Sequence, residues 1–162
     1  MNTVYKMFDG LTRTGAPSRL GVASRRLNLC SLREAEDDAI LDAAIGLEAL
    51  VCSDERTEIT YKLSLRVAAL LHKLRPEMLA SDVFRNMKHV YDFRSSVVHG
   101  DAKKIESKRF IRTSDQGSIS TIAVANEYLR LALRSVLEYP EFLDTKIIDE
   151  RLLLSFPPAS LS

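Results

Sequence analysis

The sequence predicts an all-α protein, an up-and-down bundle of four long helices with short flanking helices. Apolar residues recur at spacings of three and four along nearly every long segment, and Gly and Pro fall between these segments. A chain of 162 residues with 46% hydrophobic content can bury one core. We therefore expect one helical domain over residues 18–154, after a leader (1–17) and before a tail (155–162).

The first two helices are predicted from an amphipathic segment and a capping signal. A short helix from about Ser18 to Leu29 is expected to carry three arginines on its polar side: Arg19, Arg25 and Arg26. Ser31 followed by Glu34 fits a capping box, and a long helix should run from there to about Cys52. The apolar face of this long helix consists of Ile40, Ala43, Leu47 and Val51.

Two more helices follow a turn at Ser53-Asp54-Glu55. The apolar face of the third helix consists of Ile59, Leu63, Val67, Leu70 and Leu74, and Pro76 closes that helix. Ser81-Asp82 should cap the fourth helix, and Gly100 can adopt the left-handed conformation that often terminates helices. The face of the fourth helix consists of Val83, Met87, Val90, Arg94 and Val97.

The last third of the chain is predicted to hold a loop and the final helices. The polar stretch from Asp101 to Gly117 is expected to be the one long loop. A long helix then stops before Pro140, and a short segment from Ile147 to Leu154 precedes the tail. The apolar face of the long helix consists of Ile122, Ala125, Leu129, Ala132 and Val136.

Charge and cysteine content limit the function classes. The chain has 23 Lys plus Arg against 22 Asp plus Glu, so any anion binding must be local. Cys30 and Cys52 lack the partners of a zinc site and are interpreted as reduced thiols. No apolar run approaches the roughly 20 residues of a membrane span, and Lys6 and Asp9 occupy the core of any signal peptide. We expect a cytoplasmic protein that needs no membrane, metal or cofactor.

Arg94-Ser-Ser-Val-Val-His99-Gly100 is the candidate site, because it sets a cation and an imidazole where an apolar helix ends. A guanidinium in a hydrophobic seam needs a carboxylate, a polar cavity or an anionic ligand. Arg94 and His99 would supply the cation and the base that RNA cleavage by its own 2′-hydroxyl requires. Five helical residues separate their directions by about 140°. They therefore converge only on an unwound last turn or between two subunits.

Three segments resemble the HEPN superfamily, and within it the Apea-like HEPN group. They are Leu47-Glu48-Ala49-Leu50, the stretch from Glu58 to Arg66, and Tyr91-Asp-Phe-Arg94-Ser-Ser-Val-Val-His99-Gly100. The likeness spans about residues 19–137, and its most specific part is the Tyr-Asp-x-Arg-x-x-x-x-His-Gly run.

The resemblance implies a helical homodimer that cleaves RNA without metal, with Arg94 and His99 as the catalytic pair facing a dimer cleft. Whether the chain is a toxin with an antitoxin or another protein as partner, a defence effector or a housekeeping factor stays open. Active ribonucleases of the superfamily often have Asn, Asp or His directly after the arginine, where this chain has Ser95. Ser95, Glu48 and Arg66 are taken as supporting residues.

Other interpretations of the same residues stay open. Arg94 could be a paired interface arginine, and Glu48 its structural counter-ion; Arg66 is better explained as a snorkelling side chain. A basic run past His99 could be solvated surface or could guide an RNA backbone; it contains Lys103, Lys104, Lys108, Arg109 and Arg112. His72 and His89 are expected at the surface, and Tyr61 and Tyr91 at the edge of the core.

Two alternatives to catalysis follow from these interpretations. The first is a non-catalytic HEPN module that binds RNA, nucleotide or a protein partner in the same cleft. The second is a purely structural dimerisation domain, which would require Arg94 to be fully paired by carboxylates and His99 to be buried.

Overall fold

A computed structural model describes residues 19–52, 58–113 and 117–154, and it confirms the all-α bundle. The elements are α2 (Arg19–Leu32), α3 (Glu36–Val51), α4 (Ile59–Leu74), α5 (Ala80–His99), α6 (Ala102–Lys108), β1 (Phe110–Arg112), β2 (Ser118–Ser120), α7 (Thr121–Glu138), the 3-10 helix η1 (Pro140–Leu143) and α8 (Thr145–Leu154). The predicted leader, the tail, the turn at residues 53–55 and the helix start at Ser18 lie outside the described residues.

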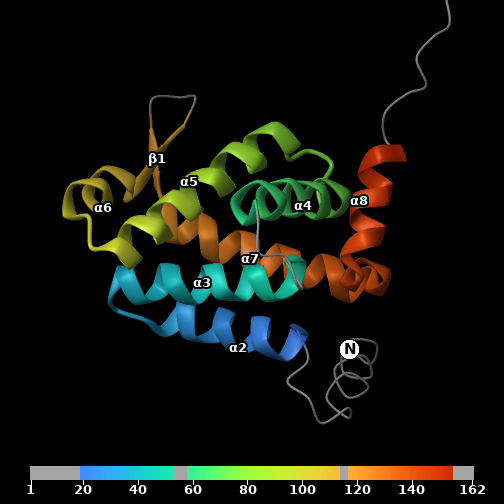
Figure 1. The fold of residues 1–162 in the computed structure, drawn as a ribbon, viewed down its shortest axis with the longest axis horizontal. Coiled ribbons are helices and arrows are strands. Elements are labelled where there is room, and N and C mark those ends of the chain that lie inside the picture. Colours follow the sequence, from blue (N-terminus) through green and yellow to red (C-terminus); the bar gives the residue numbers. More distant parts are fainter. Residues whose placement is uncertain (1–18, 53–57, 114–116, 155–162) are drawn as a thin grey trace, which may run out of the picture.

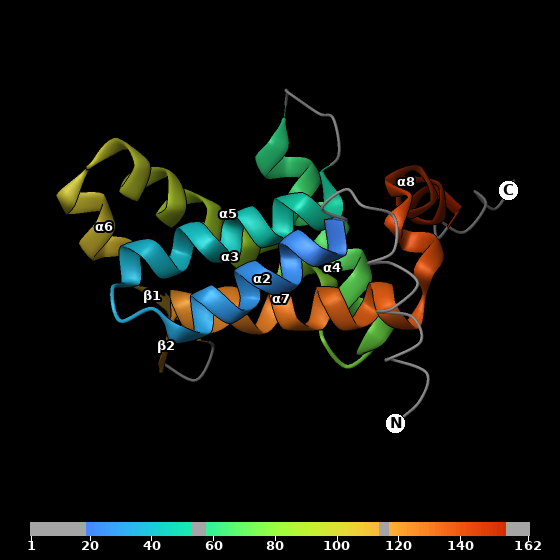
Figure 2. The same ribbon diagram turned by 90° about the horizontal axis from the view of Figure 1, so that it is seen from below.

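Helix α7 packs against α2, α3, α4 and α5, and α3 likewise packs against α2, α4, α5 and α7 (Figures 1 and 2). The α6 helix and the small hairpin lie at one end of the molecule, and α8 lies at the other. Large side chains at these helix contacts are fully buried, among them Leu47 of α3, Phe93 of α5 and Leu129 of α7. Within the described ranges, no helix combines the length and the apolar character that crossing a membrane requires.

Both predicted N-caps are wrong. The α2 helix extends to Leu32 and includes Ser31, whose hydroxyl donates to the Leu27 carbonyl. The α3 helix then starts after Ala35 without a side-chain cap. Three acidic residues in its first turn stabilise it instead, because their negative charges interact favourably with the positive end of the helix dipole. Likewise α5 begins at Ala80 after Leu79, one residue before the expected Ser81-Asp82 cap.

The end of α5 matches the prediction. Gly100 adopts a left-handed conformation with φ of 66° and follows the last helical residue, His99. The backbone N–H groups of Gly100 and Asp101 donate to carbonyls of the last turn, at 3.1 and 3.0 Å. The helix is therefore regular through His99, which fixes the direction of both candidate site residues.

The predicted long loop from Asp101 to Gly117 is wrong. Asp101 caps α6 by accepting from the backbone N–H of Lys104, so a helix forms in this lysine-rich stretch. An antiparallel hairpin follows, in which Ile111 of β1 pairs with Ile119 of β2 and is buried. The polar composition gives no apolar pattern that would predict α6 or the hairpin, since only one strand residue is buried.

Arg19 does not lie on a solvent-facing side of α2 as predicted. Its guanidinium donates to the backbone carbonyls of Ala49, Leu50 and Leu143, at 2.9, 2.6 and 2.6 Å. These bonds join the start of α2 to the end of α3 and to η1. Arg26 pairs with the buried Asp42 of α3, and only Arg25 is exposed as expected.

Candidate functional site

Arg94 and His99 both lie at the C-terminal end of α5, but they face different neighbours. The buried stripe of this helix continues through Phe93 and Ser96, so Arg94 flanks the seam instead of interrupting it. Arg94 faces α3, whereas His99 is exposed beside α6. Because α5 stays helical between the two residues, their directions differ by about 140°. The chain alone does not bring them to one hollow.

Arg94 is incompletely paired. Its Nη2 lies 3.9 Å from Oε1 of Glu48 on α3, beyond hydrogen-bond distance. The Nε of Arg94 and the Oε1 of Glu48 are both shielded from solvent, and neither has a hydrogen-bond partner in the described part of the chain. The two side chains are 28% and 27% exposed, so other parts of the pair meet solvent although these two atoms do not. An unmade hydrogen bond at a buried charged atom is costly.

Tyr91 completes this cluster, and the sequence interpretation did not single it out as a site residue. The guanidinium carbon of Arg94 lies 5.3 Å from the centroid of the Tyr91 ring, within cation–π range. Burial, followed by the charge of Glu48, raises the pKa of Tyr91 to about 12. Tyr91 is half-buried, as expected, and its position three residues before Arg94 is the sequence signal for the contact.

His99 lies in a second, polar hollow of about 450 Å³ between α5 and α6. Its other lining residues are Asp92, Ser95, Ser96, Asp101, Lys104 and Lys108. Ser95, one turn before His99, therefore faces the hollow that His99 occupies, and Arg94 is not among the described residues that line it. Lys104 pairs with Asp101 at 3.1 Å and Lys108 with Asp92 at 3.4 Å. The hollow thus holds two lysines, each balanced by a carboxylate.

The predicted basic run is spread over α6 and β1. Lys104 and Lys108 line the His99 hollow, whereas Lys103 is exposed on α6. Arg109 pairs with Glu36 and Glu106. Arg112 on β1 lines a different hollow, which Asn86 and Ile119 also line.

Arg66 is not part of this site, and its interpretation as a snorkelling side chain is wrong. The residue is buried in α4, with 2% of its surface exposed. Its guanidinium donates to both carboxylate oxygens of Asp149 on α8, at 2.8 and 2.6 Å, and to the Val51 carbonyl at 2.7 Å. Arg66 therefore joins α4 to α8 and to the end of α3.

The other histidines make backbone contacts. His72 is exposed, as expected, and its Nδ1 lies 3.0 Å from the Met78 carbonyl oxygen. His89 is half-buried instead of exposed; its Nε2 lies 3.0 Å from the Lys108 carbonyl oxygen, and burial lowers its pKa. Over the residues with a described placement, no three or more His, Cys, Asp or Glu side chains come together as a metal site.

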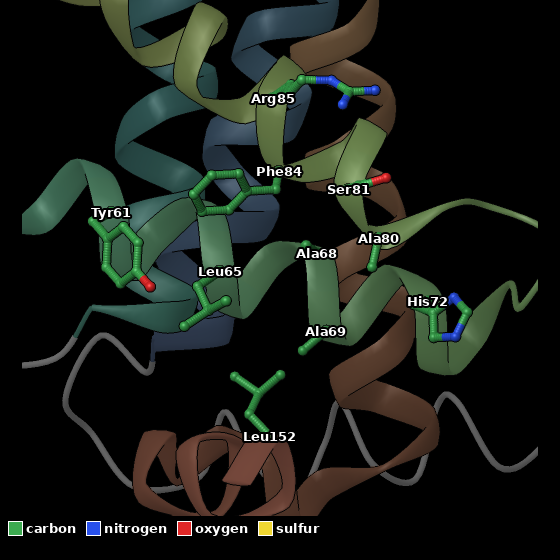
Figure 3. A pocket seen from close by; sticks show the side chains of 10 residues that line it. All are labelled: Tyr61, Leu65, Ala68, Ala69, His72, Ala80, Ser81, Phe84, Arg85 and Leu152. Atoms are coloured by element: carbon green, nitrogen blue, oxygen red, sulfur yellow. The ribbon is translucent and has the colours of Figure 1, made fainter. Parts of the chain in front are cut away.

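A separate apolar groove of about 480 Å³ lies between α4, the start of α5 and α8 (Figure 3). Tyr61 and Phe84 meet edge to face at its border, with ring centroids 5.8 Å apart, and Leu152 of α8 lies opposite them. Tyr61 is 54% exposed, so it lies farther from the core than predicted. The groove contains neither Arg94 nor His99 and belongs to the other half of α5.

Comparison of the chain with family models, curated proteins and solved structures finds no match. The functional conclusion therefore depends on the geometry of the Arg94 and His99 surroundings and on the resemblance noted above.

Proposed function

We propose that the protein is a metal-independent HEPN endoribonuclease whose active site is completed in a homodimer. The observation that carries this proposal is the Arg94 guanidinium, which faces only a distant carboxylate and has a buried Nε without a hydrogen-bond partner among the described residues. A phosphate oxygen is a suitable ligand for the partly exposed part of this side chain, because guanidinium groups form charge-assisted hydrogen bonds with phosphate. One turn further on, His99 is exposed and open to a substrate.

The two side chains supply the chemistry of RNA self-cleavage. Neutral His99 accepts the proton of a 2′-hydroxyl as its oxygen attacks phosphorus, and Arg94 stabilises the charge that develops on the phosphoryl oxygens. The bond from phosphorus to the 5′-oxygen breaks, and imidazolium returns the proton to that oxygen. The products are a 2′,3′-cyclic phosphate and a 5′-hydroxyl.

A two-fold dimer would bring Arg94 and His99 side chains together at one site, which a single chain does not do. An axis near the C-terminal ends of two α5 helices would set Arg94 of one protomer against His99 of its partner. Val98, between the two residues, is 53% exposed, and burial in such an interface would remove this apolar surface from water. Light scattering should then report twice the 18.2 kDa chain mass.

RNA is expected to approach over the α6 side of the site. Lys104 and Lys108 line the hollow that contains His99, and exchange of their carboxylate partners for phosphates would bind a backbone there. A cytoplasmic role as a toxin or defence effector, with an antitoxin or another protein as partner, rests on the family resemblance.

The second candidate is a HEPN module that binds RNA, nucleotide or a protein partner in the same cleft without cleaving it. The pairing of both lysines with Asp92 and Asp101 favours this alternative, because it leaves the His99 hollow near neutrality. Ser95 at the position after Arg94 is the other feature that supports it.

Incubation of the purified protein with labelled RNA in EDTA tests the proposal. We expect cleavage of single-stranded RNA with 2′,3′-cyclic phosphate ends, and loss of cleavage in Arg94→Ala and His99→Ala with unchanged helical circular dichroism. RNA that binds but stays intact would instead support the non-catalytic module. Absence of both binding and cleavage, across structured and unstructured RNAs, would contradict the proposal.

A further inference from the structure

One face of the small hairpin presents an aromatic ring to solvent. Phe110 of β1 is 55% exposed, and it is the only exposed phenylalanine in the described part of the chain. Its partner across the hairpin is Ser120, whose side chain is too small to cover a phenyl ring. The next residue, Ile111, lies on the opposite face and is buried. Among the residues that the structure describes, neither a second ring nor a cation lies on the Phe110 ring. The ring is therefore open to a planar ligand.

A cation lies on the same face of the hairpin. Arg112 follows Phe110 by two residues, and alternate residues of a strand share a face. Arg112 is exposed and makes no ion pair or side-chain hydrogen bond with any described residue, whereas Arg109 is paired with two carboxylates. The residues opposite, Ser118 and Ser120, are uncharged. This face therefore combines an open aromatic ring with an unbalanced positive charge.

The hairpin is continuous with the hollow that contains His99. Lys104 and Lys108 line that hollow, and the Lys108 carbonyl oxygen lies 3.0 Å from Nε2 of His89, farther back on α5. Because an α-helix rises about 1.5 Å per residue, His89 is about 15 Å from His99 along the helix axis. Phe110 follows Lys108 by two residues and so begins near that level of α5. A single strand with a phosphate in the hollow can reach the hairpin within a few nucleotides.

We propose that this hairpin face, formed by Phe110, Arg112, Ser118 and Ser120, binds an unpaired base of a single-stranded RNA whose backbone passes the His99 hollow. The base stacks on Phe110, and a neighbouring phosphate contacts Arg112. Every base has a π-face, so this contact tolerates many sequences, but it requires a base that is free of a duplex. Because the ligand is taken to be RNA, the inference rests on the proposed function.

The ring and the cation should affect binding differently. Phe110→Ala should lower the affinity for a single strand at least about fivefold, the smaller end of the effect of losing one stacked base, without changing the salt dependence. Arg112→Gln should lower the slope of log affinity against log salt by roughly 0.7. Phe110→Tyr keeps an aromatic ring and should bind as wild type does.

The test compares two fluorescently labelled probes of equal length, binding to the full-length protein followed by anisotropy. The first is a single-stranded RNA with a 2′-O-methyl group on every ribose, which has no free 2′-hydroxyl to attack phosphorus and is not cut. The second has the same backbone without bases. The preference of wild type for the first probe should fall at least about fivefold in Phe110→Ala, while the affinity for the second probe stays the same.

Two further variants complete the design. Phe110→Leu keeps an apolar side chain on the strand but has no π-face, so it should show the same loss and guards against a folding defect in Phe110→Ala. The matched control is Tyr61→Ala, because Tyr61 is 54% exposed but lies on α4 in the separate apolar groove. Its affinity for both probes should equal that of wild type, and circular dichroism checks the fold of each variant.

Equal affinities of wild type and Phe110→Ala for the first probe would overturn the inference, as would a loss that the second probe shares or that Tyr61→Ala reproduces. A change of molar mass in Phe110→Ala, measured by light scattering, would make the hairpin a contact between copies of the chain and would also overturn it. Cleavage of unmodified RNA is measured separately. The expected affinities without cleavage would retain the base contact and contradict the ribonuclease activity, whereas cleavage with equal affinities would do the reverse. Absence of probe binding by wild type would contradict both.

Discussion

Arg66 and Arg94 lie on neighbouring helices, but they differ in burial and in how completely other residues satisfy their hydrogen bonds. Arg66 is buried in α4 and donates to Asp149 and Val51 with short hydrogen bonds. Arg94, at the end of α5, is partly exposed and keeps a buried Nε that no described residue satisfies. A fully satisfied charge stabilises one arrangement, whereas an unsatisfied one is ready for a ligand.

The comparison shows why apolar periodicity alone did not distinguish the two arginines. Both residues follow the spacing of an apolar helix face, and for Arg66 the snorkelling alternative was favoured. What separates them is the geometry of their carboxylate partners, and those partners come from distant parts of the chain: Asp149 lies 83 residues from Arg66. Substitutions at the two pairs and around them test this difference.

Asp149→Ala should cost the most folding stability, about 3 kcal/mol, because it removes the carboxylate that neutralises the buried Arg66. Glu48→Ala, the matched substitution at the other pair, should change stability by less than about 1 kcal/mol, as Arg94 remains partly hydrated. Urea titration followed by circular dichroism measures both. Equal losses would show that the two pairs do not differ as described.

Arg94→Ala should lower the rate of RNA cleavage by about 10² to 10³, the usual effect of removing one group that stabilises transition-state charge. Its free energy of unfolding, measured by urea titration, should stay within about 1 kcal/mol of wild type, since the pair it breaks is weak. Initial rates in EDTA measure the first quantity. A variant that unfolds instead would place Arg94 in the structural class with Arg66.

Replacement of Lys104 and Lys108 by Gln should weaken RNA binding and flatten its dependence on salt. Each lost phosphate contact lowers the slope of log affinity against log salt by roughly 0.7 for a single strand. Lys73 of α4 and Lys146 of α8 provide the control pair when changed to Gln, because both are exposed and neither lines the His99 hollow. An unchanged slope would mean that the His99 hollow does not bind the RNA backbone.

Acid should destabilise the fold slightly through His89. Burial lowers the pKa of this histidine, against its hydrogen bond to the Lys108 carbonyl, so the unfolded chain takes up the proton first. Stability contributed by neutral His89 is therefore lost as the pH falls below the ordinary pKa of about 6.5. His89→Gln should flatten the pH dependence between pH 7 and 5. A wild-type slope in that variant would exclude His89 as the cause.

Much of the fold followed from the sequence because helical periodicity is a local signal. The four long helices formed where apolar spacing and Pro placement indicated, and Gly100 ends α5 with the expected positive φ. The errors lie where the local signal is weak. Polar residues 101–117 gave no apolar pattern for α6 or the hairpin, and the Ser31 cap signal fell inside a longer α2.

The candidate site was predictable only in its residue identities. Arg94, His99 and Glu48 were selected from spacing and resemblance, and the structure pairs Glu48 with Arg94. That Ser95, Lys104 and Lys108 share a hollow with His99 depends on how α6 folds back from Gly100, which the sequence did not indicate. The contact of Tyr91 with Arg94 was readable from their spacing, but the placement of Glu48 beside Arg94 depends on the packing of α3 against α5.

The proposed active site combines Arg94 of one protomer with His99 of the other, and mixing two inactive variants tests this combination most directly. Arg94→Ala and His99→Ala chains are combined, unfolded together and refolded, and RNA cleavage is measured in EDTA. Half of the dimers are then mixed and each has one intact site, so cleavage should return to about a quarter of the wild-type rate. Cleavage by wild type with no recovery in the mixture would contradict the shared site.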